Sequence, residues 1–162
     1  MTTPTRVFDA HTTQFIAVPP EVVLDFVMDI ERYAEIDEKI RPVLWVRRER
    51  NLTEFAFRPR LGGLRGTKMV AQERLTPGER VDIVMSPAPH NRLIRVVTHY
   101  EGSFECTPVP GGTEVLRSER FAIRTPFRWF MEPFLRRTMP RLVREELQLA
   151  KDKLEREHSQ AR

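Results

Sequence analysis

Two charged residues near the end of the predicted sheet, Arg117 and Glu119, have the types and the spacing that could do chemistry. They alternate with Val115, Phe121 and Ile123, so strict strand alternation places both charges on the apolar inner face. A buried charge is costly unless it is paired, and we therefore expect each to meet a partner or a ligand. A β-bulge in this long strand is the alternative, and it would turn both side chains to solvent.

Hydroxyl groups are predicted beside this pair. The preceding strand places Thr98 and Tyr100 on the same face as Phe104, with His99 turned outward, and Tyr33 is expected to point inward from a short helix. Arg117, Glu119, Tyr33 and Tyr100 are thus the candidate catalytic residues, able to orient a substrate and transfer a proton. The alternative is that they bind a ligand without catalysing a reaction.

The remaining candidates are residues that could line an internal cavity. Plain core packing is the competing interpretation for each of them. The predicted lining consists of Trp45, Phe55, Phe57, Met69, Met85, Thr98, Tyr100, Phe104, Arg117, Glu119, Phe121, Phe130, Phe134 and Met139.

Other chemistries have little support. The four histidines are widely spaced and form no metal-binding motif, so we expect neither a metal site nor a cofactor. The single cysteine, Cys106, has no histidine at a suggestive spacing, and no serine lies in a G-x-S-x-G elbow. The glycines of segment 62–66 lie between two predicted strands and indicate a hairpin turn rather than a phosphate-binding loop.

A long amphipathic helix is predicted over residues 126–156. Apolar residues recur there at steps of three and four, while Pro133 and Pro140 should bend or break the helix. The apolar stripe consists of Phe127, Phe130, Met131, Phe134, Leu135, Met139, Leu142, Val143, Leu147, Ala150 and Leu154. Such a stripe needs a surface to cover, and the only candidate is a sheet.

That sheet is predicted from alternating segments separated by turn residues. A first strand over Arg6–Val18 is ended by Pro19 and Pro20, which favour the first turn of a helix, and a second short helix covers Glu31–Ile36. Six more strands are predicted at Val43–Arg50, Leu52–Arg58, Leu64–Leu75, Glu79–Met85, Leu93–Thr107 and Thr113–Arg124. The fold class is therefore α+β, a seven-stranded antiparallel sheet wrapped around a long C-terminal helix.

Length and composition limit the number of domains and the expected location. The 162 residues are most simply one domain, with a tail after about residue 155 that is expected to fray. No apolar run reaches the length of a membrane span and no leader-like segment is visible, which favours a cytoplasmic location. The sequence leaves open whether the protein is a monomer or a homodimer.

The net charge of +4 is concentrated in one segment. Residues 124–144 hold six arginines against one acid, Glu132, interleaved with aromatic residues. A solvated helix face is the simplest interpretation, and peripheral contact with an anionic membrane is the sharper one. The helix could also serve as a protein-interaction surface. No nucleic-acid motif is present, so a nucleic-acid partner is not expected.

Three stretches together resemble the START-like or SRPBCC superfamily. They are segment 16–23 leading into Asp29–Tyr33, Tyr100–Phe104 followed by the Gly-Gly-Thr hairpin at 111–113, and the closing helix. Within that superfamily the chain is most similar to the bacterial polyketide cyclase/dehydrase and lipid-transport group. Many members have a tryptophan where Ile36 stands here.

The resemblance implies a helix-grip fold and two functions. The first is binding or transport of an apolar or amphipathic small molecule, such as a lipid, isoprenoid or polyketide, in an internal cavity. The second is an aromatase/cyclase type of reaction on a chain held in the same cavity. Because the fold hosts both, residues rather than topology must decide between them.

Overall fold

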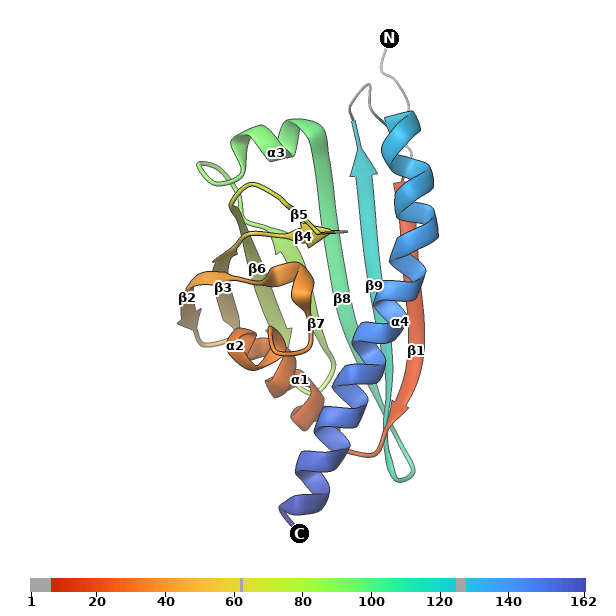
Figure 1. The fold of residues 1–162 in the computed structure, drawn as a ribbon. Helices are drawn as coiled ribbons and strands as arrows, with labels where there is room; N and C mark the ends of the chain where they lie inside the picture. Colours follow the sequence, from red (N-terminus) through yellow and green to blue (C-terminus); the bar gives the residue numbers. More distant parts are fainter. Residues whose placement is uncertain (1–6, 62, 125–127) are drawn as a thin grey trace.

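The computed structural model describes residues 7–61, 63–124 and 128–162, which form a seven-stranded antiparallel sheet, a separate two-stranded hairpin, a long helix and several short helices (Figure 1). Arg6, Gly62, Pro126 and Phe127, which the sequence assigned to a strand, a turn and the long helix, lie outside the described residues. The strands are β1 (Val7–Ile16), β2 (Val43–Glu49), β3 (Leu52–Phe57), β4 (Arg60–Leu61), β5 (Leu64–Arg65), β6 (Met69–Thr76), β7 (Arg80–Met85), β8 (Thr98–Val109) and β9 (Gly112–Ile123). The helices are α1 (Pro20–Met28), α2 (Ile30–Tyr33), the 3-10 helix η1 (Glu38–Ile40), α3 (Arg92–Val97) and α4 (Arg128–Gln160).

The main sheet has seven strands in the order β1-β9-β8-β7-β6-β3-β2, and all neighbours are antiparallel. From β2 onward each strand of this sheet pairs with the next one of the sheet along the chain, and the last strand, β9, also pairs with β1. The β8–β9 pairing runs without a shift from Thr98–Ile123 to Val109–Gly112. The expected fold class is confirmed, and the bulge that would have turned Arg117 outward is not present in this pairing.

The short helices follow from local sequence. Pro19 and Pro20 occupy the start of α1, where a missing N–H costs nothing, and Phe26 is buried on its inner face. The side chain of Asp37 then accepts a hydrogen bond from the Lys39 N–H at 2.9 Å, which caps η1. This cap fixes the position from which Lys39 enters the interior.

Helix α4 is a single element of 33 residues that passes through Pro133 and Pro140. The helix is therefore not broken at either proline, while a bend there stays a prediction. The carbonyls that the prolines leave without a helical donor belong to Trp129 and Arg136, both exposed residues, so water can reach these groups. The inner side of α4 buries Leu135, Met139, Val143, Leu147, Ala150 and Leu154, and it packs mainly along β1.

Two predicted strands are shorter than expected. The segment predicted as Leu93–Thr107 begins as helix α3, because Asn91 adopts a left-handed conformation and accepts the Arg95 N–H at 2.9 Å. The segment predicted as Leu64–Leu75 enters the sheet only at Met69, since β5 pairs with β4 in a separate hairpin. Both differences lie at the end of the molecule where the first turns of α4 are found (Figure 1).

Substituting Leu147 by alanine is expected to lower the free energy of unfolding by about 2–5 kcal/mol, because its side chain is 1% exposed in the main core. Leu149→Ala is the matched control, since Leu149 is 48% exposed on the same helix and should change stability by about 0.5 kcal/mol or less. Urea unfolding measures both. Equal losses in the two variants would contradict the packing of α4 on the sheet.

Candidate functional site

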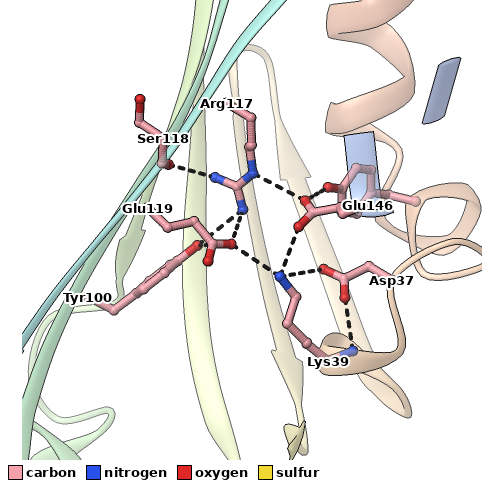
Figure 2. Close-up of polar contacts among 8 residues, drawn as sticks. Asp37, Lys39, Tyr100, Arg117, Ser118, Glu119 and Glu146 are labelled. Atoms are coloured by element: carbon pink, nitrogen blue, oxygen red, sulfur yellow. Dashed lines mark hydrogen bonds and ion pairs between the residues drawn. The ribbon is translucent and has the colours of Figure 1, made fainter. Parts of the chain in front are cut away.

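Polar side chains from α2, η1, β8, β9 and α4 meet in the interior between the sheet and α4 (Figure 2). This interior polar cluster consists of Tyr33, Asp37, Lys39, Tyr100, Arg117, Glu119 and Glu146. Because the elements that supply it are far apart in the sequence, the cluster exists only in the folded chain.

Arg117 is the centre of the cluster and is 2% exposed. Its Nη2 donates to Glu119 Oε1 at 2.5 Å and to the Tyr100 hydroxyl at 3.3 Å, while its Nε donates to Glu146 Oε1 at 3.1 Å. Its Nη1 donates to the Ser118 carbonyl at 2.9 Å, and its guanidinium lies 4.4 Å from the centre of the Phe104 ring. A buried charge with this many partners is compensated rather than isolated.

Lys39 closes the cluster from the side of η1. Its Nζ donates to Glu146 Oε2 at 2.8 Å and to Glu119 Oε1 at 3.2 Å, and it lies 3.8 Å from Asp37 Oδ2. The lysine side chain is 18% exposed, more than the carboxylates that it contacts. Tyr33 completes the arrangement by donating its hydroxyl hydrogen to Glu146 Oε1.

Gly102 on β8 makes room for these contacts. A Cβ at this position would lie 2.7 Å from the Tyr100 hydroxyl oxygen and 2.8 Å from Arg117 Nη1. Any other residue would therefore push the tyrosine or the arginine out of place. The glycine of the penultimate strand thus has a steric role at the cluster rather than a role in a turn.

The carboxyl groups of the cluster differ in the direction in which their pKa values are shifted. Burial alone would raise the pKa of Glu119, but Lys39 and Arg117 outweigh burial and hold that pKa below its ordinary value. Burial raises the pKa of Asp37 against the opposing effect of Lys39. Burial also raises the pKa of Glu146 to about 8, although the Lys39 and Arg117 cations that contact it favour its charged form.

Glu73 is a further buried acid beside the cluster, and the sequence reasoning missed it. It lies in a row of paired inner positions that runs across the sheet from Glu73 through Ile83 and Gly102 to Glu119. Burial raises the pKa of Glu73 to about 8, so the carboxyl is largely protonated at pH 7. The Oε2 atoms of Glu73 and Glu119 have no hydrogen-bond partner among the described residues.

Two of the buried acids that were not predicted, Glu73 and Glu146, could have been recognised from the periodicity of the sequence. Glu73 alternates with Ala71 and Leu75 on the inner face of its strand, as an inward residue must. Glu146 lies three residues after Val143, on the apolar stripe of α4. Asp37 and Lys39 had no such signal, because their segment has neither a strand period nor a long helix period.

The residues predicted to line a cavity are mostly part of the interior. Phe55, Phe57, Met85, Phe104 and Met139 are buried, while Met69, Thr98, Tyr100 and Phe121 are half-buried. Among them, the structure brings Tyr100, Arg117 and Glu119 together with the predicted Tyr33 through direct or shared partners.

The prediction of an interior position was wrong for three of the lining residues. A register shift between Val43 and Trp45 places Trp45 opposite Ala56, on the face away from Phe55, where its ring lies beside His90. Phe130 and Phe134 are 70% and 50% exposed, because the buried stripe of α4 in these turns runs through Leu135 and Met139 on the other side of the helix.

Hollows are found at several places around the cluster. A hollow of about 600 Å³ covers the outer face of the β7, β8, β9 and β1 strands, and another of about 570 Å³ lies between α2, η1 and the β4–β5 hairpin. A much smaller hollow of about 10 Å³ lies between the first turns of α4 and the β1 and β9 strands, with Phe8 and Phe121 in its wall. Within the described ranges, His, Cys, Asp and Glu side chains form no group of three that could hold a metal ion. No helix of the described chain is long and apolar enough to cross a membrane.

Residues 7–155 match the family described as polyketide cyclase/dehydrase and lipid transport. The chain belongs to this family. The match covers the first strand through most of α4, so it includes every residue of the interior polar cluster. No curated protein matches the chain.

Solved structures share the fold at low sequence identity. The protein TTHA0849 from Thermus thermophilus is 17% identical with a TM-score of 0.74, and the alignment covers 91% of this chain and 97% of that one. The aromatase/cyclase Zhui from Streptomyces sp. R1128 is 14% identical with a TM-score of 0.70, covering 92% and 96%. The di-domain aromatase/cyclase StfQ from the steffimycin biosynthetic pathway is 17% identical with a TM-score of 0.73, covering 94% of this chain and 52% of that one. These likenesses show the helix-grip fold.

The raised pKa of Glu73 predicts a pH dependence of stability that Glu73→Gln removes. The folded state holds this proton more tightly than the unfolded chain, whose glutamate pKa is about 4.3. Stability contributed by Glu73 is therefore lost as the pH rises toward about 8, by at most about 1.4 kcal/mol per pH unit. Urea unfolding from pH 5 to 9 should show the wild type falling relative to the variant, and parallel curves would contradict the assignment.

Proposed function

We propose that this chain binds an amphipathic small molecule between the inner face of the sheet and α4, with the interior polar cluster at the polar end of the site. The position of Tyr100 carries this proposal. Its hydroxyl lies within hydrogen-bond distance of Arg117 and Glu119, while its ring packs against the half-exposed Phe121 with 5.0 Å between ring centroids. One side chain thus joins a buried polar group to a partly open apolar surface.

The apolar part of the site continues toward the first turns of α4. Phe121 stacks on Phe8 at a centroid distance of 6.5 Å, and both line the small hollow beneath α4. Because this hollow is about 10 Å³, it admits no organic ligand as it stands. Binding therefore requires the first turns of α4 to move away from β1 and β9, a motion of the kind that opens ligand sites in other proteins.

The polar part of the site favours a ligand with hydrogen-bond donors. The unpartnered Glu119 Oε2 belongs to a carboxyl whose charged form is favoured, so it can only accept a hydrogen bond. The neutral Glu73 can donate a hydrogen bond to a carbonyl or hydroxyl oxygen. A molecule that carries hydroxyl or phenol groups on an apolar body can donate to the first group and accept from the second. The family assignment supports a ligand of this amphipathic kind.

Native mass spectrometry of freshly purified protein tests the binding function directly. We expect a retained small molecule that denaturation releases. Affinity is then measured by fluorescence with two probes, the lipid cis-parinaric acid and the phenolic 1,8-dihydroxyanthraquinone. An empty protein that binds neither probe would overturn the proposal.

Glu119→Gln should weaken binding of the better probe by about tenfold or more, because a buried hydrogen bond to a charged group contributes about 1.5–3 kcal/mol. Glu114→Gln is the matched control, since Glu114 is exposed on the same strand and should leave affinity within about twofold. Equal affinity of both variants and the wild type would remove the cluster from the binding site.

A cyclisation reaction is the second candidate, and Glu73 is the observation that favours it. A carboxyl that is neutral at pH 7 can protonate a ketone oxygen while a neighbouring carbanion forms the new carbon–carbon bond. Having given up its proton, the Glu73 carboxylate can take a second proton from the same carbon and pass it to the new hydroxyl, which leaves as water. The proton removed to form the carbanion then returns to Glu73, and no oxidant or reductant is needed. Arg117 and the Tyr100 hydroxyl would orient the chain beside it.

Glu73→Gln distinguishes ligand binding from cyclisation, because glutamine keeps the shape of the neutral carboxyl group but cannot act as an acid. If the chain catalyses cyclisation, turnover of a poly-β-ketone thioester should fall by about 10²–10⁴-fold in this variant while probe affinity changes little. If the chain only binds, the wild type will retain a ligand and show no turnover above the uncatalysed rate. Product mass, lower than that of the substrate by one water per aromatised ring, reports the reaction.

A further inference from the structure

The outward face of the first turns of α4 is apolar, although it does not contact the core. Trp129 and Phe130 are 77% and 70% exposed, and Phe134 lies one turn beyond Phe130 on the same side of the helix. The core side of the same turns is formed by Leu135 and Met139, both buried. The helix therefore presents two apolar faces here, and only one of them has a partner.

Helix α3 adds exposed apolar side chains at the same end of the molecule (Figure 1). Leu93 and Val96 are largely exposed, and α3 buries none of its residues. The Arg124 N–H donates to the Val97 carbonyl at 2.8 Å, which ties the end of β9 to the end of α3. We call residues 92–97, 124 and 128–137 the α3–α4 end.

The charges of the α3–α4 end are almost all positive. It holds six arginines, at positions 92, 95, 124, 128, 136 and 137, and one acid, Glu132. Glu132 pairs with Arg136 and Arg128 along the helix. Arg92, Arg95 and Arg137 make no ion pair with another described residue and are exposed. Exposed aromatic rings thus share this end of the molecule with three arginines that form no ion pair within the described residues.

We propose that the α3–α4 end docks on the surface of an anionic lipid bilayer. Tryptophan and phenylalanine side chains partition into the interfacial region of a bilayer, and arginines at the same depth pair with acidic headgroups. Both kinds of side chain are exposed on this end, on two helices that β8 and β9 hold in place. The outward face of α4 beyond this end is polar at Arg141, Arg144 and Gln148, which limits the contact to the first turns.

Charge complementarity selects the bilayer over a second copy of the chain. Two copies joined through this end would bring twelve arginines together with only two acids, the two copies of Glu132, which are already paired, and this opposes association. An anionic bilayer supplies the missing negative charge and an apolar layer for the rings. The proposal is independent of the small-molecule function, because it concerns exposed residues outside the interior polar cluster.

The docking is tested by the fluorescence of Trp129 in Trp45→Phe, a variant with a single tryptophan. The vesicles are phosphatidylcholine alone or phosphatidylcholine mixed with phosphatidylglycerol. We expect a blue shift of Trp129 emission and quenching by brominated lipid only with the anionic vesicles. Binding should weaken as salt shortens the screening length below the ~10 Å reached at 0.1 M.

Matched variants separate the apolar and charged contributions. Phe130→Ser and the pair Arg92→Glu, Arg95→Glu should each reduce vesicle affinity by about tenfold or more. Leu149→Ser and Arg144→Glu, exposed on α4 outside the α3–α4 end, should change it by less than about twofold. Urea midpoints should stay unchanged in all variants, since every substituted side chain is exposed.

Three results would overturn the proposal. One is the absence of binding to either vesicle, and another is equal binding to neutral and anionic vesicles. The third is a dimer in solution that Phe130→Ser dissociates, because a second copy would then cover the exposed rings. Retention of a small molecule by the protein bears on none of these results, so the two functions fail separately.

Discussion

The burial of the Arg117 guanidinium is the constraint on which the interior of this protein depends. An arginine cannot lose its charge, so its removal from water must be compensated by anions and acceptors that the fold supplies. Glu119 comes from the same strand, Glu146 from α4 and the Tyr100 hydroxyl from the neighbouring strand. The long helix and the sheet are thus joined by a hydrogen bond from Arg117 to Glu146 as well as by the apolar stripe.

The same constraint explains why acids outnumber cations in this region. Arg117 and Lys39 contact Glu119 and Glu146, Lys39 also lies near Asp37, and Glu73 is buried within electrostatic reach of Arg117. An interior with all four acids ionised would carry excess negative charge. Protonation of Glu73 relieves part of this excess, at a pKa of about 8. A buried proton within electrostatic reach of Arg117 is a chemical resource that a purely apolar lining would not offer. This resource is why a cyclase-type reaction is kept beside simple binding.

Strand alternation predicted the inward direction of Arg117 and Glu119 because β8 and β9 pair without a shift over their full length. It failed for Trp45, because one irregular pair on an edge strand reverses the faces that follow. The partners of the charged pair were harder to predict, since Lys39 reaches the cluster from a three-residue helix fixed by a side-chain cap. Periodicity reports which face a residue occupies, whereas the meeting of residues from distant elements depends on the complete fold.

The close packing of Gly102 against Tyr100 and Arg117 limits how this interior can change in evolution. The missing side chain at Gly102 and the presence of Tyr100 and Arg117 form one steric unit, because a Cβ there would overlap both polar groups. Related chains can therefore exchange these three positions only as a group. A chain that replaces both the arginine and the tyrosine by smaller residues is released from the need for glycine, and its neighbouring acids keep only the lysine as a counter-ion. Covariation of these positions across relatives would trace where the charged interior was acquired and where it was lost.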